Sequence, residues 1–99
     1  MVKRVRWNKR AIVKLDGWVD YLEQEVSFQS ASILLKNVRD KIEILKKQPT
    51  IGRAVKSMKT VRFVNVDKNR HLFYRVQSTT IFITDLFDVR QNPNKRPYS

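Results

Sequence analysis

The 99-residue sequence lacks cysteine, and it has only one histidine, two glycines and three prolines. Without cysteine the chain can form no disulfide and no thiolate zinc site, which fits a reducing compartment such as the cytoplasm. One histidine excludes a site with two histidine ligands, so we expect no metal. Glycine and proline are too scarce for a collagen-like or low-complexity chain. Gly17 and Gly52 lie too far apart to form a phosphate-binding loop, and we expect no cofactor.

Long hydrophobic runs are missing as well. No apolar stretch approaches the ~20 residues that a transmembrane helix needs, so we expect no membrane interaction. The charged segment from Met1 to Trp7 is not followed by an apolar one, which argues against a secretory signal. The hydrophobic fraction of 41%, with 10% aromatic residues, is enough for one folded domain over residues 1–99.

Acidic residues are scarce relative to basic ones. The chain has 21 Lys and Arg against 9 Asp and Glu, which gives a formal charge of +12 at pH 7. The acids concentrate in 16–25, whereas 44–66 and the last ten residues contain none. A chain with this charge and this distribution attracts polyanions or an acidic protein.

The spacing of apolar residues predicts two helices. After Asn8, a favourable N-cap, apolar residues recur at helical spacing, and a second such stripe runs over 31–45. Ser27 or Ser30 is expected to cap the second helix, and Pro49 to end it. Because few residues separate the helices, they are expected to form an antiparallel hairpin.

The remaining chain predicts strands and a tail. Strands are expected over 2–7, 60–66, 71–77 and 80–87. The order of elements predicts an α+β fold: an N-terminal strand, an antiparallel helical hairpin, and then three strands that form a mainly antiparallel four-stranded sheet (βααβββ). Residues 91–99 are expected to be an extended tail. Gly17 interrupts the first helical pattern at a cost of about 1 kcal/mol relative to alanine, so close packing is expected there.

Four segments together resemble the RelE/ParE superfamily of bacterial type II toxins, over essentially the whole chain. They are Val5-Arg6-Trp7 with Ala11 and Leu15; the turn Pro49-x-Ile51-Gly52-Arg53; His71-Leu72-Phe73-Tyr74-Arg75-Val76; and Phe87-Asp88-Val89-Arg90-Gln91-Asn92-Pro93. Their combination, in this order, is more specific than any one of them. The resemblance implies a small toxin with a helical hairpin on a four-stranded sheet, and an antitoxin that wraps and neutralises it.

The superfamily has two mechanistic branches, one that cleaves mRNA within the ribosome and one that inhibits DNA gyrase by binding. The segment from His71 to Arg75 resembles the gyrase-inhibiting branch more closely, since the ribonuclease branch often has arginine where this chain has His71. The resemblance therefore favours a gyrase inhibitor that is not an enzyme, with a ribosome-dependent endoribonuclease as the alternative. The charge alone also allows a small basic nucleic-acid-binding module.

If the chain is a ribonuclease, the catalytic candidates are His71, Arg75, Arg90 and Tyr98. Attack of a 2′-OH on the adjacent phosphate needs a base, an acid and cations. The histidine has a suitable pKa for proton transfer, and the arginines can stabilise the developing charge. The alternative roles are structural: a histidine bonded to neighbouring backbone, arginines that guard a sheet edge, and a tyrosine in a frayed tail.

Two further sets of residues are binding candidates. The target- or anion-binding residues are expected to be Arg53, Lys56, Lys59, Arg62, Arg75 and Arg90. The antitoxin-binding residues are expected to be Trp18, Tyr21, Leu22, Arg53 and Arg62. Arg53 has an alternative role in closing the turn after the second helix, and the aromatic residues in packing the core. The expected partners are an acidic antitoxin encoded adjacently, in a hetero-oligomer, and DNA gyrase, with the ribosome and mRNA as the alternative target.

Overall fold

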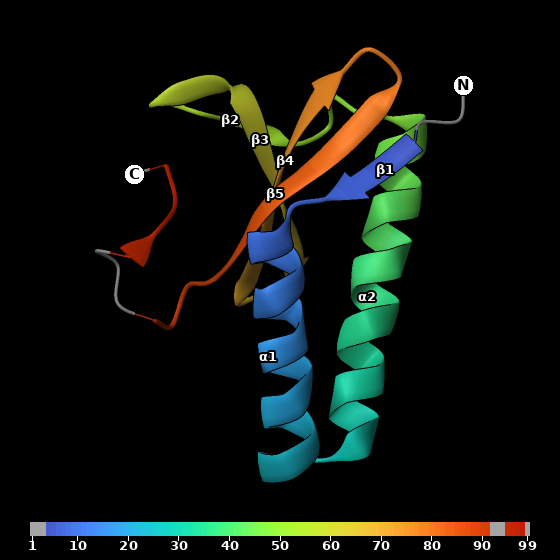
Figure 1. Cartoon of the computed structure of the whole chain (residues 1–99), viewed down its shortest axis with the longest axis vertical. Helices are drawn as coiled ribbons and strands as arrows, with labels where there is room; N and C mark the ends of the chain where they lie inside the picture. Colours follow the sequence, from blue (N-terminus) through green and yellow to red (C-terminus); the bar gives the residue numbers. More distant parts are fainter. Residues whose placement is uncertain (1–3, 92–94, 99) are drawn as a thin grey trace.

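The computed structural model of the chain describes residues 4–91 and 95–98 (Figure 1). Its elements are β1 Arg4–Trp7, α1 Lys9–Glu25, α2 Phe28–Lys47, β2 Arg53–Val55, β3 Met58–Asp67, β4 Arg70–Gln77 and β5 Thr80–Asp88. The α+β class, the helical hairpin and the strands that follow it are as expected from the sequence. The expected first strand is observed from Arg4, and residues 2 and 3 lie outside the described part.

The two helices begin at residues that suit helix starts. Asn8 precedes α1 in an extended conformation, although its side chain makes no capping hydrogen bond within the described part of the chain. Ser27 caps α2, because its Oγ accepts a hydrogen bond from the backbone N–H of Ser30 at 3.0 Å. Only Val26 and Ser27 separate the helices, which therefore run antiparallel, side by side (Figure 1).

The strands form one sheet in the order β1-β5-β4-β3-β2. β1 runs parallel to β5, and the other neighbours are antiparallel. The sheet has five strands, one more than the sequence predicts, because Arg53–Val55 pairs with the first half of β3. A three-residue strand is too short to show the alternation that identifies strands in a sequence.

The main core lies between the helical hairpin and one face of the sheet. Its buried side chains are Ala11, Leu22, Ala31, Leu34, Val38, Ile42, Leu45, Val66, Leu72, Tyr74, Ile81, Ile83 and Leu86. Full burial of a Leu or Ile side chain contributes about 1.5–3 kcal/mol relative to exposure, so this layer dominates the stability of the fold.

The hairpin extends past the end of the sheet at its α1–α2 connection (Figure 1). Apolar side chains there have no sheet to cover them: Val26 is 59% exposed and Phe28 72% exposed. Neither helix, over the residues described, is long and apolar enough to cross a membrane. The tip of the hairpin is therefore an exposed apolar surface at the edge of the molecule.

The two glycines lie in opposite surroundings. The expected close packing at Gly17 is wrong, because no atom of the described residues outside its own helix lies within 4 Å of the position that a Cβ would take. A Cβ on Gly52 would lie 2.6 Å from Tyr74 Oη and 2.9 Å from the backbone oxygen of Phe63. Gly52 is thus required by close packing, and Gly17 is not.

Part of the C-terminal segment lies against the sheet. Residues 92–94 and 99 of the expected tail lie outside the described residues. The ring of Tyr98 packs against Phe73 with 5.3 Å between centroids. Ser57 Oγ donates a hydrogen bond of 2.6 Å to the backbone oxygen of Tyr98. The described end of the chain therefore contacts both β4 and the β2–β3 turn.

Candidate functional site

The face of the sheet opposite the helices carries a cluster of rings, here called the aromatic face (Phe63, His71, Phe73 and Phe87). Because alternate residues of a strand point to opposite sides, Leu72 faces the main core while its neighbours His71 and Phe73 face away from it. The Phe63 and His71 rings stack with 4.8 Å between centroids. The Phe73 centroid lies 5.6 Å from that of Phe63.

The guanidinium of Arg96 lies over the aromatic face. Its Cζ is 5.2 Å, 5.3 Å and 5.7 Å from the ring centroids of Phe63, Phe73 and Phe87, within the range of cation–π attraction. Its Nη1 lies 3.0 Å from Nδ1 of His71. Because arginine can only donate, Nδ1 accepts this hydrogen bond and the proton of the neutral imidazole sits on Nε2. The C-terminal segment thus supplies a cation to the aromatic face.

Burial, and then the positive charge of Arg96, lower the pKa of His71 below its ordinary value of 6.5. The imidazole is therefore neutral at pH 7. In this state it can donate a hydrogen bond through Nε2, while Nδ1 is occupied by Arg96. It adds no positive charge that would stabilise a phosphate.

The structure brings two of the four catalytic candidates to one surface. His71 and Tyr98 both contact the ring of Phe73, with centroid distances of 6.3 Å and 5.3 Å. Arg75 lies over the Phe82 ring, with its Cζ 4.3 Å from the centroid, and donates a hydrogen bond to Gln77 Oε1. Among the described residues, no hydrogen bond joins Arg75 to His71.

Arg90, the fourth candidate, forms a bidentate pair with Asp88. Its Nε donates to Asp88 Oδ1 at 3.0 Å and its Nη2 to Oδ2 at 2.6 Å. This pairing lowers the pKa of Asp88 and raises that of Arg90. Arg90 lines a groove against α1, so the structure does not place it with His71 on the aromatic face.

Arg62, expected to bind an anion or the antitoxin, closes the turn between α2 and β2. Its Nη1 donates to the backbone oxygens of Gly52 at 2.8 Å and Thr50 at 3.2 Å. In the same turn, the buried Tyr74 hydroxyl accepts a hydrogen bond from the Gly52 N–H and donates one to the Pro49 oxygen. Burial raises the pKa of Tyr74, which keeps this hydroxyl protonated. The sequence allowed Arg53 to close this turn. In the structure Arg62, on the adjacent strand β3, closes it.

Arg53, Lys56 and Lys59 are exposed, and none of their side chains forms a hydrogen bond or ion pair within the described part of the chain. Arg53 and Lys56 line a groove of about 420 Å³ together with Arg96 and Tyr98, beside the aromatic face. This cationic groove can accept carboxylates or phosphates of a ligand.

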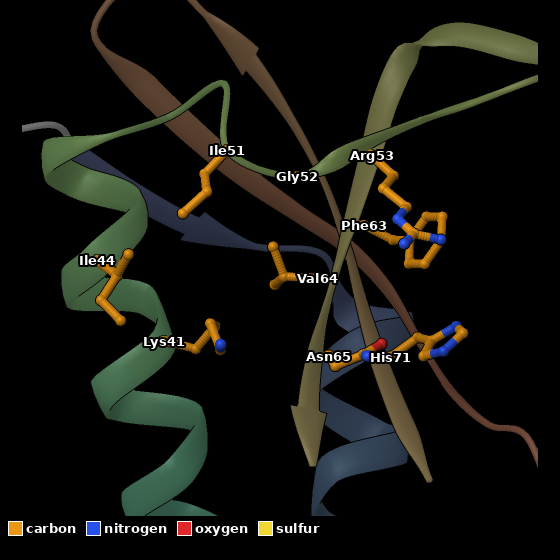
Figure 2. A pocket seen from close by; sticks show the side chains of 9 residues that line it. All are labelled: Lys41, Ile44, Ile51, Gly52, Arg53, Phe63, Val64, Asn65 and His71. Carbon is orange, nitrogen blue, oxygen red and sulfur yellow. The ribbon is translucent and has the colours of Figure 1, made fainter. Parts of the chain in front are cut away.

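A second groove, of about 450 Å³, lies between α2 and the edge of the sheet. Figure 2 shows Ile44 on α2 facing Ile51 and Val64 across this groove, while Phe63 and His71 project to the other side of the sheet. The edge is open here because β2 pairs only with the first half of β3. The groove therefore combines apolar walls with an unpaired strand edge.

A third groove, here called the α1 groove, has a volume of about 540 Å³. It is lined by Lys14, Gly17, Trp18, Tyr21, Arg70, Leu86, Asp88, Arg90 and Gln91. Trp18 is half-buried and contacts the guanidinium of Arg70, whose Cζ lies 5.3 Å from the ring centroid. Tyr21 is 60% exposed, whereas Leu22 is only 8% exposed and belongs to the main core. Of the antitoxin candidates on α1, Trp18 and Tyr21 thus line this surface.

Sequence reasoning missed several residues of these surfaces. Lys14 Nζ pairs with the buried Asp85 at 2.7 Å, and Arg70 pairs with Asp67 at 2.8 Å. The sequence signal for Lys14 was Asp85, an acidic residue within an apolar strand, because a buried carboxylate needs a cationic partner. Arg96 carried no signal beyond its charge, because its contact with His71 joins residues 25 positions apart.

The immediate neighbours of His71 are a cation and an aromatic ring. In the described part of the chain, no group of His, Asp and Glu side chains could hold a metal ion. His71 is bonded to a cation, and no carboxylate of the described residues is bonded to it. What the molecule offers a ligand is exposed cations, the exposed ring of Tyr21 and apolar grooves.

Solved structures of small bacterial toxins share this fold. The chromosomal ParDE toxin–antitoxin system from P. aeruginosa matches with a TM-score of 0.74 and 16% identity, over 89% of this chain and 97% of that chain. The YoeB/ParE toxin from Agrobacterium tumefaciens matches with 0.66 and 12%, over 86% and 96%. The E. coli DinJ-YafQ complex matches with 0.61 and 8%, over 89% and 93%. At these identities the likeness defines the fold class.

The family follows from the sequence match. The model of the family described as ParE toxin of the type II toxin-antitoxin system, parDE, matches residues 5–93. The chain therefore belongs to the ParE toxin family, and the superfamily expected from the sequence segments is confirmed. No curated protein sequence matches the chain.

Proposed function

We propose that this toxin inhibits DNA gyrase by binding and is not an enzyme. The observation that carries the proposal is the state of His71, which is neutral and bonded through Nδ1 to Arg96. The arginines expected to assist catalysis are engaged elsewhere: Arg75 with a glutamine and Arg90 with an aspartate. Such a surface can recognise a partner, but its histidine has no free nitrogen to accept a proton from a 2′-OH.

The target-binding surface in this proposal is the cationic groove beside the aromatic face. Arg53 and Lys56 line it and have no ionic partner among the described residues, and Lys59 lies on the adjacent strand. Free cations at the rim of an interface accelerate association with an acidic partner surface. Arg62 does not contribute charge in this way, because it holds the preceding turn.

An acidic antitoxin is the second proposed partner. The chain carries a net charge of +12. Apolar and aromatic area is exposed at Tyr21 on α1 and at Val26 in the connection that follows it. An acidic segment that folds on binding can neutralise the charge and bury this area. Two of the structures with this fold are toxin–antitoxin systems, ParDE and DinJ-YafQ, which supports such a partnership.

A supercoiling assay with purified toxin and DNA gyrase tests the target. We expect loss of supercoiling, and relief of inhibition by the double change Arg53→Glu and Lys56→Glu. The charge-matched control is Arg39→Glu with Lys47→Glu, two exposed cations of α2, which should leave inhibition unchanged. Gyrase that stays fully active at high toxin excess excludes this target.

A ribosome-dependent endoribonuclease is the second candidate, favoured by one observation. His71, Arg96 and Tyr98 meet on the aromatic face, where two of them are catalytic candidates. This function predicts mRNA cleavage in a translating extract that is abolished by His71→Ala in a folded protein. Intact mRNA in the presence of the toxin excludes it.

A further inference from the structure

Nothing in the described chain requires glycine at position 17. It lies in the middle of α1, where glycine destabilises a helix relative to alanine. It is exposed, and a Cβ at this position would touch no atom of the described residues outside its own helix. Alanine would therefore fit without strain and would stabilise the helix. The packing of the fold does not explain why residue 17 is glycine.

The missing side chain opens the wall of the α1 groove. Gly17 lies one turn from Lys14 and Tyr21, and all three line this groove opposite the end of β5. At this point the helix backbone itself is accessible between larger side chains. A bulky apolar side chain of a partner can approach the helix here more closely than at any residue that bears a Cβ.

The α1 groove continues around the molecule. At Arg70 and Arg90 it meets another groove, of about 330 Å³, whose lining includes Val26 between the helices and Ile33 on α2. These two side chains are 59% and 52% exposed. The path from Gly17 to Ile33 thus offers a row of apolar contacts to a continuous segment of a partner.

The net charge of the whole chain, +12, favours an acidic occupant of the α1 groove. Its lining contains three cations, Lys14, Arg70 and Arg90, and one carboxylate, Asp88. Each cation already has a carboxylate partner in the fold, namely Asp85, Asp67 and Asp88 in the same order. The Arg90 side chain is nevertheless 57% exposed, so its remaining N–H donors are open to a partner. The Nε of Arg70 is buried and makes no hydrogen bond within the described part of the chain, although an Asp88 carboxylate oxygen lies 3.9 Å away. A partner whose apolar side chain is flanked by carboxylates matches this arrangement.

We propose that Gly17 forms a slot for a bulky apolar side chain of the acidic antitoxin, and that this slot determines which antitoxin the toxin accepts. The antitoxin segment lies along the α1 groove with carboxylates toward Arg70 and Arg90. The proposal rests on the proposed function for the identity of the partner. It adds that Gly17 is the residue that determines how well the toxin and the antitoxin fit together.

The test compares Gly17→Ala and Gly17→Leu with Ser32→Leu, an exposed position on α2 that lines none of the grooves described above. The probe is the acidic protein encoded beside this toxin, titrated calorimetrically onto each purified variant. We expect Gly17→Leu to weaken binding at least tenfold and Gly17→Ala several-fold, while Ser32→Leu binds like the unchanged chain. Gyrase inhibition by both Gly17 variants should persist. Gly17→Ala should melt at a higher temperature than the unchanged toxin, so its weaker binding cannot result from misfolding.

The outcomes separate this proposal from the proposed function. Undiminished binding by Gly17→Leu and Gly17→Ala overturns the slot while leaving the antitoxin partnership in place. Loss of gyrase inhibition with intact antitoxin binding would assign the groove to the target and also overturns the slot. If the unchanged toxin does not bind the acidic protein at all, the partnership fails and the slot fails with it.

Discussion

The surroundings of Gly52 and Gly17 show two different uses of a missing side chain. At Gly52 the Tyr74 hydroxyl and the Phe63 backbone occupy the space that a Cβ would need. At Gly17 that space is empty within the described chain and opens onto a groove. The first glycine completes a contact inside the fold, and the second leaves a contact available to a partner.

The same contrast extends to the surfaces next to each glycine. Beside Gly52, the aromatic face is covered by the chain's own Arg96, and Arg62 holds the turn. Beside Gly17, Tyr21 remains largely exposed and no described segment enters the groove. Substitutions of Gly52 and of the side chains bonded to it, Tyr74 and Arg62, should therefore change stability. Substitutions near Gly17 should change binding with little loss of stability.

The largest effect is expected from Gly52→Ala. The added Cβ would lie 2.9 Å from the Phe63 backbone oxygen, which cannot move aside as a flexible side chain can. Overpacking and the disturbed Tyr74 hydrogen bonds together should lower the free energy of unfolding by about 3 kcal/mol. Urea denaturation measures this change. A variant as stable as the unchanged protein would show that the turn adapts and that the contrast with Gly17 is false.

Tyr74→Phe should have the next largest effect. It keeps the buried ring and removes the hydroxyl that accepts from the Gly52 N–H and donates to the Pro49 oxygen. Leaving these backbone groups unpaired should lower the free energy of unfolding by about 2 kcal/mol. The control is Tyr21→Phe, which removes a hydroxyl from an exposed ring and should be neutral. If the two changes have equal effects in denaturant titrations, the turn does not depend on Tyr74.

The elements of the fold could be predicted because each long one repeats a pattern. The apolar stripe from Ala31 to Leu45 covers α2, and short apolar runs bounded by turn residues mark β4 and β5. β2 could not be predicted, since three residues show no period and owe their strand conformation to pairing with β3. The two glycines were indistinguishable in the sequence, because the difference lies in what the rest of the fold brings to each.

The candidate surfaces were predicted less completely than the fold. Charge and resemblance pointed to Arg53 and Lys56, which the structure places in one cationic groove. They could not separate these free cations from Arg62, whose partners come from a turn ten residues away. Nor could they place Arg96 on the aromatic face, because that contact depends on the path of the C-terminal segment. Side-chain roles set by tertiary contacts leave no local pattern.

Gly17→Ala should have a smaller effect on stability, of opposite sign. Alanine favours an exposed helix interior over glycine, and nothing in the described chain obstructs its methyl group. We expect the free energy of unfolding to rise by about 1 kcal/mol, measured by the same denaturant titrations as for Gly52→Ala. A destabilised variant would mean that α1 needs the glycine for its own conformation, and the contrast between the two glycines would not hold.

The smallest effect concerns the pH dependence of the aromatic face. Because the folded-state pKa of His71 lies below its ordinary value of 6.5, the unfolded chain takes up a proton first as the pH falls. The contribution of this group to stability is therefore complete above about pH 6.5 and decreases below it, until the pH reaches the folded-state pKa. His71 is the one histidine of the sequence, so its proton resonance reports this pKa without overlap.

Arg96→Ala tests the origin of this dependence. Removing the guanidinium takes away its repulsion and uncovers the imidazole, and both changes should raise the pKa of His71 toward 6.5. Lys95→Ala, at the exposed preceding residue, should leave the pKa unchanged. An NMR titration of all three proteins decides the matter. Identical titration curves would show that Arg96 does not cover the aromatic face in solution, and that this face is as open to a partner as the groove beside Gly17.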